Sequence, residues 1–196
     1  MRSQKKIGLY FGTFNPIHVG HLTIANYLVE FSDLDEVWLV VTPHNPHKIK
    51  STLLDDSHRL SMARIALEDY PKLKASNVEF ELNQPNYTVN TLIHLEEKHP
   101  DLSFCLIMGE DNLKSFHKWK NYEVILERYS IYVYPRVSEG TVNTRFNNHS
   151  KIQLVNAPIM ELSSTFIRNS IKTGKNIRPM LPHSVWKYID EMNFYK

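Results

Sequence analysis

Two histidines, His18 and His21, are the side chains of this chain best suited to chemistry on a phosphate. They lie in the stretch I-G-L-Y-F-G-T-F-N-P-I-H-V-G-H-L (7–22), where an apolar run ends in a turn and a helical pattern begins. A helix N-terminus presents unpaired N–H groups and a partial positive charge, which favours a phosphate at this point. Gly12 and Gly20 let the backbone approach a ligand closely. Imidazoles on one face of the first helical turn can donate hydrogen bonds to phosphoryl oxygens.

The same stretch has plainer interpretations. Histidines near a helix start are often surface or capping residues, and glycines often only shape a turn. Two histidines could also hold a metal ion, but the protease motif has four-residue spacing and an intervening glutamate, which is absent here. The dinucleotide-binding pattern G-x-G-x-x-G and the P-loop pattern are absent as well. The combination of strand, G-T-F-x-P, H-x-G-H and helix therefore favours a nucleotide phosphate site over these alternatives.

A second candidate phosphate site lies near the C-terminus, in E-L-S-S-T-F-I-R (161–168). Ser163, Ser164 and Thr165 supply hydroxyls at a predicted helix start, where serine and threonine are also ordinary N-caps. Arg168 follows on the first turn. A helix N-terminus beside a guanidinium suits a polyphosphate tail.

Together the two stretches resemble the paired signature of the nucleotidyltransferase superfamily, which contains the small adenylyl- and cytidylyltransferases. The resemblance implies that the second stretch binds the β- and γ-phosphates of a nucleotide. Class I aminoacyl-tRNA synthetases share the H-x-G-H pattern, but they are much longer and carry a lysine-rich second motif that this chain lacks.

The elements that position these residues are those of an α/β protein. With 196 residues and 42% hydrophobic content, the chain is expected to form one domain (1–196) with a small C-terminal helical part from about 160 to 196. Alternating strands and helices predict a Rossmann-like, doubly wound parallel sheet with helices on both faces. Ligands bind such sheets at the carboxyl ends of the strands, and the unusual loops follow the first, second, fourth and sixth predicted strands.

The predicted strands cover residues 6–11, 36–41, 78–82, 102–108, 130–134 and 152–155. Five predicted helices cover residues 19–31, 88–98, 122–128, 164–173 and 182–192. Another predicted helix begins at Ser57, and one more follows the loop at 109–111. The polar segment 137–150 is expected to be an exposed excursion.

Composition limits the partners and the compartment. A formal net charge of +2, without runs of like charge, gives no reason to expect nucleic acid as a partner. The single cysteine, Cys105, lies in an apolar run and suits a reducing cytoplasm. No stretch has the length and apolar character of a membrane span or a signal region. We therefore expect a cytoplasmic protein without nucleic-acid or membrane partners; homo-oligomer formation stays open.

The middle of the chain resembles one family in particular, nicotinate-nucleotide adenylyltransferase. The stretches that carry the resemblance are P-H-N-P-H-K (43–48), N-Y-T-V-N-T-L (86–92), I-M-G-E-D-N-L-K-S-F-H-K-W (107–119), Y-P-R (134–136) and L-P-H-S-V-W-K-Y-I (181–189). The resemblance implies transfer of the adenylyl group of ATP to nicotinate mononucleotide, giving deamido-NAD and pyrophosphate in NAD biosynthesis. It also implies that Mg²⁺ accompanies the ATP, keeping several waters rather than entering a protein cage.

The family pattern, matched position by position, implies three groups of site residues. The catalytic group is His18, His21, Lys48 and Arg168. The ATP-binding group is Gly12, Thr13, Phe14, Pro16, His18, Gly20, His21, Gly109, Asp111, Ser163, Ser164, Thr165 and Arg168. The substrate-binding group is Asn15, His44, Tyr87, Thr88, Asp111, Trp119 and Arg136.

Physical chemistry gives several of these residues a specific role and an alternative. Lys48 is a cation beside the triphosphate or an ordinary surface lysine. Tyr87 and Thr88, at a helix start, could hold the nicotinate carboxylate. Trp119 offers a flat face for the pyridine ring, or packs in the core. Arg136, at a strand end, suits the mononucleotide phosphate.

The chain also departs from the family pattern. Phe11 stands where a second glycine is common, and Asn15 stands where an aspartate is common. Asparagine keeps the acceptor oxygen and loses the charge, so we expect the turn to survive. Arg136 lacks the Pro-Gly that usually follows it.

Two other functions stay open on the sequence. One is another adenylyltransferase of the same fold, for nicotinamide mononucleotide or phosphopantetheine. The other is a nucleotide-binding regulator without catalytic activity, although such a protein would be expected to have lost some of His18, His21 and Arg168.

Overall fold

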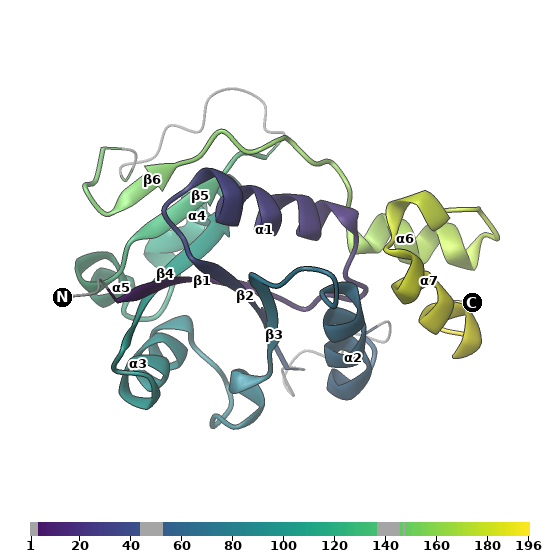
Figure 1. The fold of residues 1–196 in the computed structure, drawn as a ribbon, viewed down its shortest axis with the longest axis horizontal. Coiled ribbons are helices and arrows are strands. Elements are labelled where there is room, and N and C mark those ends of the chain that lie inside the picture. Colours follow the sequence, from purple (N-terminus) through teal and green to yellow (C-terminus); the bar gives the residue numbers. More distant parts are fainter. Residues whose placement is uncertain (1–3, 44–52, 137–145, 147) are drawn as a thin grey trace.

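The structure, a computed structural model, describes residues 4–43, 53–136, 146 and 148–196. Among them, six strands form one sheet in the order β3-β2-β1-β4-β5-β6, and every neighbouring pair is parallel (Figure 1). The strands are β1 (Lys5–Gly12), β2 (Glu36–Val41), β3 (Leu73–Ser76), β4 (Leu102–Gly109), β5 (Ile131–Tyr134) and β6 (Ile152–Leu154). This is the strand order of the doubly wound fold expected from the sequence.

Helices cover both faces of this sheet. They are α1 (Val19–Phe31), α2 (Asp56–Ala66), α3 (Thr88–Lys98), α4 (Glu110–Ser115), α5 (Tyr122–Arg128), α6 (Ser164–Lys172) and α7 (His183–Glu191). Short 3₁₀ helices are η1 (Val78–Phe80), η2 (Phe116–Lys118) and η3 (Arg178–Met180). Residues of α1, α2, α6 and α7 share one buried cluster, and residues of α3, α4 and α5 share the other.

The central strands are mostly apolar because both of their faces are covered. In β4, Phe104 and Leu106 belong to the α3–α5 cluster, whereas Cys105 and Ile107 belong to the α1 cluster. Alternate side chains of a strand point to opposite faces of the sheet. A central strand such as β4 therefore contributes side chains to both buried clusters. The same alternation sends Tyr10 and Tyr134 to the α1 face.

The predicted third strand was wrong. Residues Val78 to Phe80 form η1, and the strand is β3, a few residues earlier. Its Leu73 pairs with Val37 and its Ser76 with Val40, so β3 is an edge strand beside β2. An edge strand of four residues carries little apolar signal, and the more apolar segment after it packs against the sheet as a turn of helix.

The predicted excursion at 137–150 lies mostly outside the described residues. Phe146, however, is 6% exposed and packs edge-on against Phe116 and Tyr122, with ring centroids 5.5 and 6.0 Å away. The expectation of exposure is therefore wrong for this residue. The three residues after the next one, 148–150, are exposed as expected.

The C-terminal helices lie at the end of the molecule where the strands finish. Figure 1 shows α6 and α7, in yellow, beyond α2 and far from the N-terminus. The hydroxyl of Tyr195 donates a hydrogen bond to Oδ1 of Asn15 at 2.7 Å, which brings the last residues to the turn after β1. Within the described parts of the chain, no helix is both long and apolar enough to span a membrane.

Candidate active site

The two histidines lie together at the start of α1. His18 is the N-cap residue, His21 lies in the first turn, and their imidazole rings stack with centroids 3.7 Å apart and planes 25° apart. Phe14 presents its edge to His21 at 5.0 Å, and Tyr10 does so at 6.1 Å. Gly20 completes the arrangement, because a Cβ there would lie 3.1 Å from two atoms of the His18 ring. The glycine makes room for the imidazole.

Hydrogen bonding and burial settle the protonation of this pair. The backbone N–H of His18 donates to Nδ1 of His21 at 3.2 Å, so Nδ1 must carry a lone pair and the ring hydrogen sits on Nε2. Burial, with a smaller contribution from the charge of Arg136, lowers the pKa of His18 to about 4. Burial, followed by His18 and Arg136, holds the pKa of His21 well below its usual value. Both rings are therefore neutral near pH 7, and His21 offers an Nε2–H donor.

A cavity of about 180 Å³ opens beside these rings at the carboxyl ends of the strands. Its polar lining comes from β1, the start of α1, the end of β5 with the loop that follows it, and the start of α6. The lining residues are Tyr10, His18, Gly20, His21, Ile24, Tyr134, Pro135, Arg136, Met160, Leu162, Ser163 and Ser164. The structure thus brings both predicted phosphate stretches, separated by about 140 residues of sequence, to one cavity.

The start of α6 docks directly onto the turn after β1. The Ser164 hydroxyl donates to the carbonyl of Pro16 at 2.8 Å, and Nη1 of Arg168 donates to the carbonyl of Asn15 at 2.8 Å. Ser163 is the N-cap, and its hydroxyl accepts the N–H of Phe166 at 3.2 Å. Each of these side chains therefore has a hydrogen-bond partner within the protein.

Arg168 lies in a neighbouring cavity rather than in the one beside the histidines. Its Nη2 donates to the Thr165 hydroxyl at 3.2 Å, and Thr165 itself is exposed. The neighbouring cavity measures about 320 Å³ and is lined by Leu53, Leu54, Arg168, Asn169, Lys172, Tyr195 and Lys196. The predicted catalytic and ATP-binding roles of Arg168, and the ATP-binding role of Thr165, stay predictions.

A further cavity, of about 240 Å³, adjoins the first across Tyr10 and Tyr134, which line both. Its lining residues are Tyr10, Phe11, Gly12, Thr13, Thr42, Leu106, Ile107, Met108, Gly109, Asn112, Trp119 and Tyr134. Trp119 is half-buried against Phe116, with ring centroids 5.5 Å apart, so it both packs and lines a cavity. The predicted ATP-binding residues Gly12, Thr13 and Gly109 thus share a cavity with the predicted substrate residue Trp119.

The helix start predicted to hold a carboxylate is fixed by buried polar contacts. Tyr87 is the N-cap of α3, and Thr88 is its first residue. Just before this start, the Asn86 amide donates to the carbonyl of Glu79 at 2.8 Å. Within the helix, the Thr91 hydroxyl donates to the Glu79 carboxyl at 2.9 Å. Burial raises the pKa of Glu79. Tyr87 and Thr88 do not line either cavity in the described structure, and their substrate role stays a prediction.

Arg136 and Asp111 face each other across the ends of β4 and β5. Nε of Arg136 lies 3.8 Å from Oδ1 of Asp111, and the Arg136 backbone N–H donates to Glu110 at 3.2 Å. Tyr134 and Asp111 raise the pKa of Arg136 against the opposing effect of burial, so the guanidinium stays charged. Arg136 lines the histidine cavity, which places a fixed positive charge beside the imidazoles.

Other predicted residues lie in the framework of the turn or outside the described parts. Phe14 is 1% exposed and holds a φ of +45°, and its ring lies where a Cβ on Gly12 would come within 2.9 Å. Asn15 is 3% exposed and Pro16 is buried. His44 and Lys48 lie outside the described residues.

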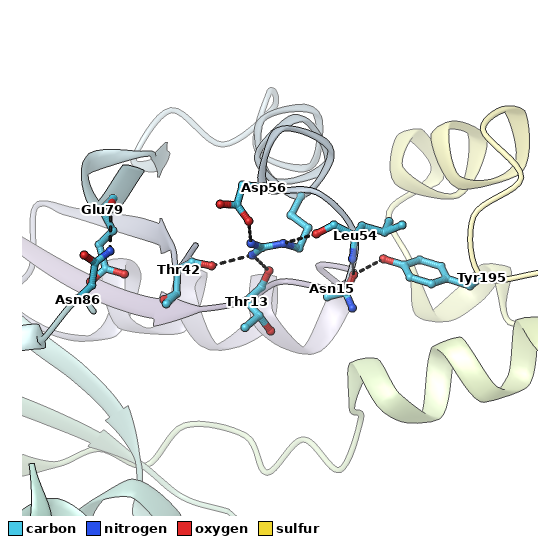
Figure 2. A network of polar contacts seen from close by, with 9 residues as sticks. Thr13, Asn15, Thr42, Leu54, Asp56, Glu79, Asn86 and Tyr195 are labelled. Atoms are coloured by element: carbon cyan, nitrogen blue, oxygen red, sulfur yellow. Dashed lines mark hydrogen bonds and ion pairs between the residues drawn. The ribbon is translucent and has the colours of Figure 1, made fainter. Parts of the chain in front are cut away.

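Sequence reasoning missed Arg59, a fully buried cation that ties three loops of the site together. Its Nη1 donates to the carbonyls of Thr13 at 2.6 Å and Thr42 at 2.8 Å, and its Nε donates to that of Leu54 at 3.0 Å. The guanidinium also pairs with Asp56. Figure 2 shows these partners converging on one guanidinium group, with Asn15 and Tyr195 beside them. A lone arginine within an amphipathic helix gives no sequence signal for such a role.

Within the described part of the chain, no group of three or more histidine, cysteine or acidic side chains could hold a metal ion. The Asp111 side chain, which faces the Arg136 guanidinium, is 61% exposed.

Comparisons with known proteins show which family the chain resembles throughout its length. The model of the cytidylyltransferase-like family matches residues 9–170. A curated relative from Christiangramia forsetii, named probable nicotinate-nucleotide adenylyltransferase, is 68% identical over 98% of this chain and 99% of its own. A relative of the same name from Cytophaga hutchinsonii is 48% identical over 97% and 98%. The solved nicotinic acid mononucleotide adenylyltransferase of Plasmodium falciparum, in complex with NaAD, has a TM-score of 0.80 at 21% identity and covers 97% of both chains.

Proposed function

The chain belongs to the nicotinate-nucleotide adenylyltransferase family, within the cytidylyltransferase-like proteins, and from this premise we propose how its site works. It is a nucleotidyltransferase that transfers the adenylyl group of ATP to nicotinate mononucleotide, giving deamido-NAD and pyrophosphate in NAD biosynthesis. We assign the adenylyl transfer to the cavity that His18, His21 and Arg136 line. The pyridine nucleotide occupies the adjoining cavity beside Trp119.

One observation carries the assignment of the reacting centre. The stacked imidazoles are neutral, and the His21 ring has its lone pair on Nδ1 occupied, so its Nε2–H is a fixed donor. It stands at a helix N-terminus, beside Arg136 and the Ser163 and Ser164 hydroxyls. Such a set stabilises the negative charge that builds up on the oxygens of the α-phosphate.

The reaction needs no general base and no covalent enzyme intermediate. An oxygen of the nicotinate mononucleotide phosphate attacks the α-phosphorus of ATP and forms the new P–O bond. The bond between the α-phosphorus and the bridging oxygen to the β-phosphate breaks, and pyrophosphate leaves with that electron pair. Catalysis is then positioning and charge stabilisation. His18 and His21 act on the α-phosphate oxygens, and Arg168 and Lys48 act on the departing pyrophosphate.

A divalent metal accompanies ATP in this class of reaction, and we propose Mg²⁺. When bound, Mg²⁺ supplies charge neutralisation on the phosphates. The described residues fit an ion held mainly by phosphate and water, since they offer no cluster of metal-ligating side chains. The protein's own cations beside the phosphates remain Arg136 and, by family resemblance, Arg168 and Lys48.

The proposal includes a preference for the nicotinate acceptor. Tyr87 and Thr88 form the start of α3, where backbone N–H groups meet a carboxylate better than an amide. We also propose a single domain with its C-terminal helices as a minor part, and a cytoplasmic location. The one cysteine, Cys105, supports that location because it is a buried free thiol.

The test is pyrophosphate release from ATP and Mg²⁺ with each of three acceptors: nicotinate mononucleotide, nicotinamide mononucleotide and phosphopantetheine. We expect turnover with the first, and a much lower kcat/KM with the second. Equal kcat/KM for the first two would remove the carboxylate assignment at Tyr87 and Thr88. Turnover with phosphopantetheine alone would overturn the pocket assignment. No turnover by a protein that still binds a non-hydrolysable ATP analogue would indicate a nucleotide-binding regulator.

A further inference from the structure

Tyr10 and Tyr134 form a buried hydroxyl pair that crosses the sheet at the site. Tyr10 is in β1 and Tyr134 ends β5, and β4 runs between these two strands. Their hydroxyl oxygens are 3.2 Å apart, and their rings meet edge to face with centroids 5.7 Å apart. The side chains are only 6% and 4% exposed.

Gly109 is the residue of β4 that allows this crossing. It pairs with Tyr134 in the sheet register, and a Cβ on it would lie 3.2 Å from both Cζ and Oη of Tyr134. Neighbouring strands are about 4.8 Å apart, so strands two places apart are about 10 Å apart. A side chain on Gly109 would therefore crowd the path by which the Tyr134 ring reaches Tyr10.

The pair forms the boundary between two cavities. Tyr10 and Tyr134 are the residues common to the linings of the histidine cavity and of the cavity that contains Trp119. In the function proposed above, the histidine cavity binds the α-phosphate of ATP, and the cavity that contains Trp119 binds nicotinate mononucleotide. The two hydroxyls therefore lie where the attacking phosphate must meet the α-phosphorus.

One of the two hydroxyl hydrogens of this pair is available to a ligand. Two hydroxyls carry two hydrogens, and only one of them can lie between the two oxygens. The other neighbour of the pair is Arg136, whose Nη2 lies 3.4 Å from the Tyr134 hydroxyl and which can only donate. Among the described residues, no hydrogen-bond acceptor takes the second hydrogen; the nearby carboxylate of Asp111 faces Arg136 instead.

We propose that the Tyr10–Tyr134 pair is a substrate-contacting element of this enzyme, which donates a hydrogen bond to a phosphate oxygen at the junction of the two substrates. This proposal rests on the proposed function. The hydroxyl keeps its proton throughout, because the step is a hydrogen bond and not a proton transfer. Burial and the facing Tyr134 hold the pKa of Tyr10 well above its usual value, so the Tyr10 hydroxyl stays protonated. Arg136, donating to the Tyr134 oxygen, makes the pair a stronger donor.

The experiment compares the variants Tyr10→Phe, Tyr134→Phe and the double variant with a matched control, Tyr132→Phe. Tyr132 lies in the same strand as Tyr134, but its hydroxyl pairs with Asp33 and Lys6 and lines neither cavity. We expect kcat to fall about 10- to 100-fold in each single variant, as for one hydrogen bond to a charged group. Because the pair acts as one unit, the double variant should lose no more than the larger single loss.

The control and a second readout separate this role from a structural one. Tyr132→Phe should lower the melting temperature and leave kcat unchanged. In the site variants, binding of a non-hydrolysable ATP analogue should change less than kcat, since the donor acts most when both phosphates are present. If one site variant fails to fold, the other single variant decides the question.

Two outcomes would overturn the proposal, and they are distinguishable. If the wild-type enzyme turns over nicotinate mononucleotide and both phenylalanine variants keep its kcat, the tyrosine pair has no part in the reaction and the proposed function stands. If the wild-type enzyme binds the ATP analogue and turns over no pyridine mononucleotide, the proposed function fails, and the role of the pair fails with it.

Discussion

Residues His18 and His21 owe their chemistry to burial more than to their place in a motif. An exposed histidine titrates near pH 6.5, whereas burial and Arg136 lower the pKa of His18 to about 4. The ring stack at 3.7 Å opposes protonation of both rings. Both rings therefore stay neutral throughout the physiological range. Binding of a phosphate favours the charged form and opposes these effects.

His21→Ala removes the Nε2–H donor from the reacting centre. We expect kcat to fall about 10²–10³-fold, the effect of losing one donor to a developing anion, with a small change in ATP-analogue affinity. Steady-state kinetics of pyrophosphate release measures it. His117→Ala is the control, because His117 is exposed on η2. A variant with wild-type kcat would exclude His21 from the mechanism.

His18 also makes the fold sensitive to acid. Its pKa is about 4 in the folded state and about 6.5 in the unfolded chain, so the unfolded state binds the proton first as the pH falls. Stability from this group is complete above pH 6.5 and is lost between pH 6.5 and 4, by about 3 kcal/mol.

Urea unfolding at pH 7 and pH 4.5 tests this. His18→Asn keeps a good N-cap residue without the titrating ring, so it should lose less stability than the wild-type protein over that interval. Parallel losses in both proteins would show that the His18 imidazole is not the group responsible.

At the scale of elements, the start of α1 and the loops after β1 and β2 are held in place by close packing. Gly20 provides the space for the His18 ring, and Arg59 of α2 holds the carbonyls of Thr13 and Thr42. The carboxyl ends of neighbouring parallel strands converge there. Substitutions at Gly20 and Arg59 should therefore affect kcat and the free energy of unfolding to different extents.

Gly20→Ala tests the packing of helix α1 against its own histidine. Alanine favours a helix over glycine by about 0.5–1 kcal/mol, whereas its Cβ would lie 3.1 Å from the His18 ring and push it aside. We expect stability to change by less than about 1 kcal/mol while kcat falls about tenfold or more. Thermal unfolding and steady-state kinetics on the same sample distinguish the two effects. Unchanged kcat would show that the ring position tolerates the methyl group.

Arg59→Met tests the support of the loops. Removing the guanidinium leaves the carboxylate of Asp56 and three carbonyl groups without this donor. We expect a loss of about 3 kcal/mol or more in the free energy of unfolding, as when one partner of a buried pair is removed. Arg64→Met is the control on the same helix, because Arg64 is exposed. Equal stabilities of the two variants would contradict the role of Arg59.

At the scale of the whole molecule, the site joins the two ends of the chain. Ser164 and Arg168 of α6 bond to the carbonyls of Pro16 and Asn15, and Tyr195 bonds to the Asn15 side chain. The start of α6 is therefore part of the wall of the site, and residues of both α6 and α7 belong to the buried core. Figure 1 shows these two helices at the end of the molecule, and Figure 2 shows the contact between Tyr195 and Asn15.

Tyr195→Phe removes the hydroxyl that links the last residues to the turn after β1. In this variant, Oδ1 of Asn15 still accepts a hydrogen bond from the N–H of Leu54, 3.3 Å away. The free energy of unfolding should therefore fall by the contribution of one hydrogen bond, about 1 kcal/mol. We also expect a rise in the KM for ATP, because the turn precedes the histidines. Tyr188→Phe, whose hydroxyl contacts His58, is the control and should lower stability alone. A KM that rises equally in both variants would argue against a specific link.

The sequence by itself determined the order and type of most elements and the helix that carries the histidines. The predicted helices 19–31, 88–98 and 122–128 coincide with α1, α3 and α5. These features depend on local periodicity, caps and turn residues, which a few neighbouring residues express. The weak edge strand β3 was misplaced because its pairing with β2, and not its own composition, defines it.

Only the tertiary structure decided which residues meet. In the sequence, Arg59 is one cation in a predicted helix. Tyr10 and Tyr134 are positions in predicted apolar strands, about 120 residues apart. Their roles arise from the strand order, which places β1 and β5 on either side of β4, and from Gly109, which leaves the space between them. Contacts between distant segments depend on how whole helices and strands pack together. A local pattern of residues does not specify that packing.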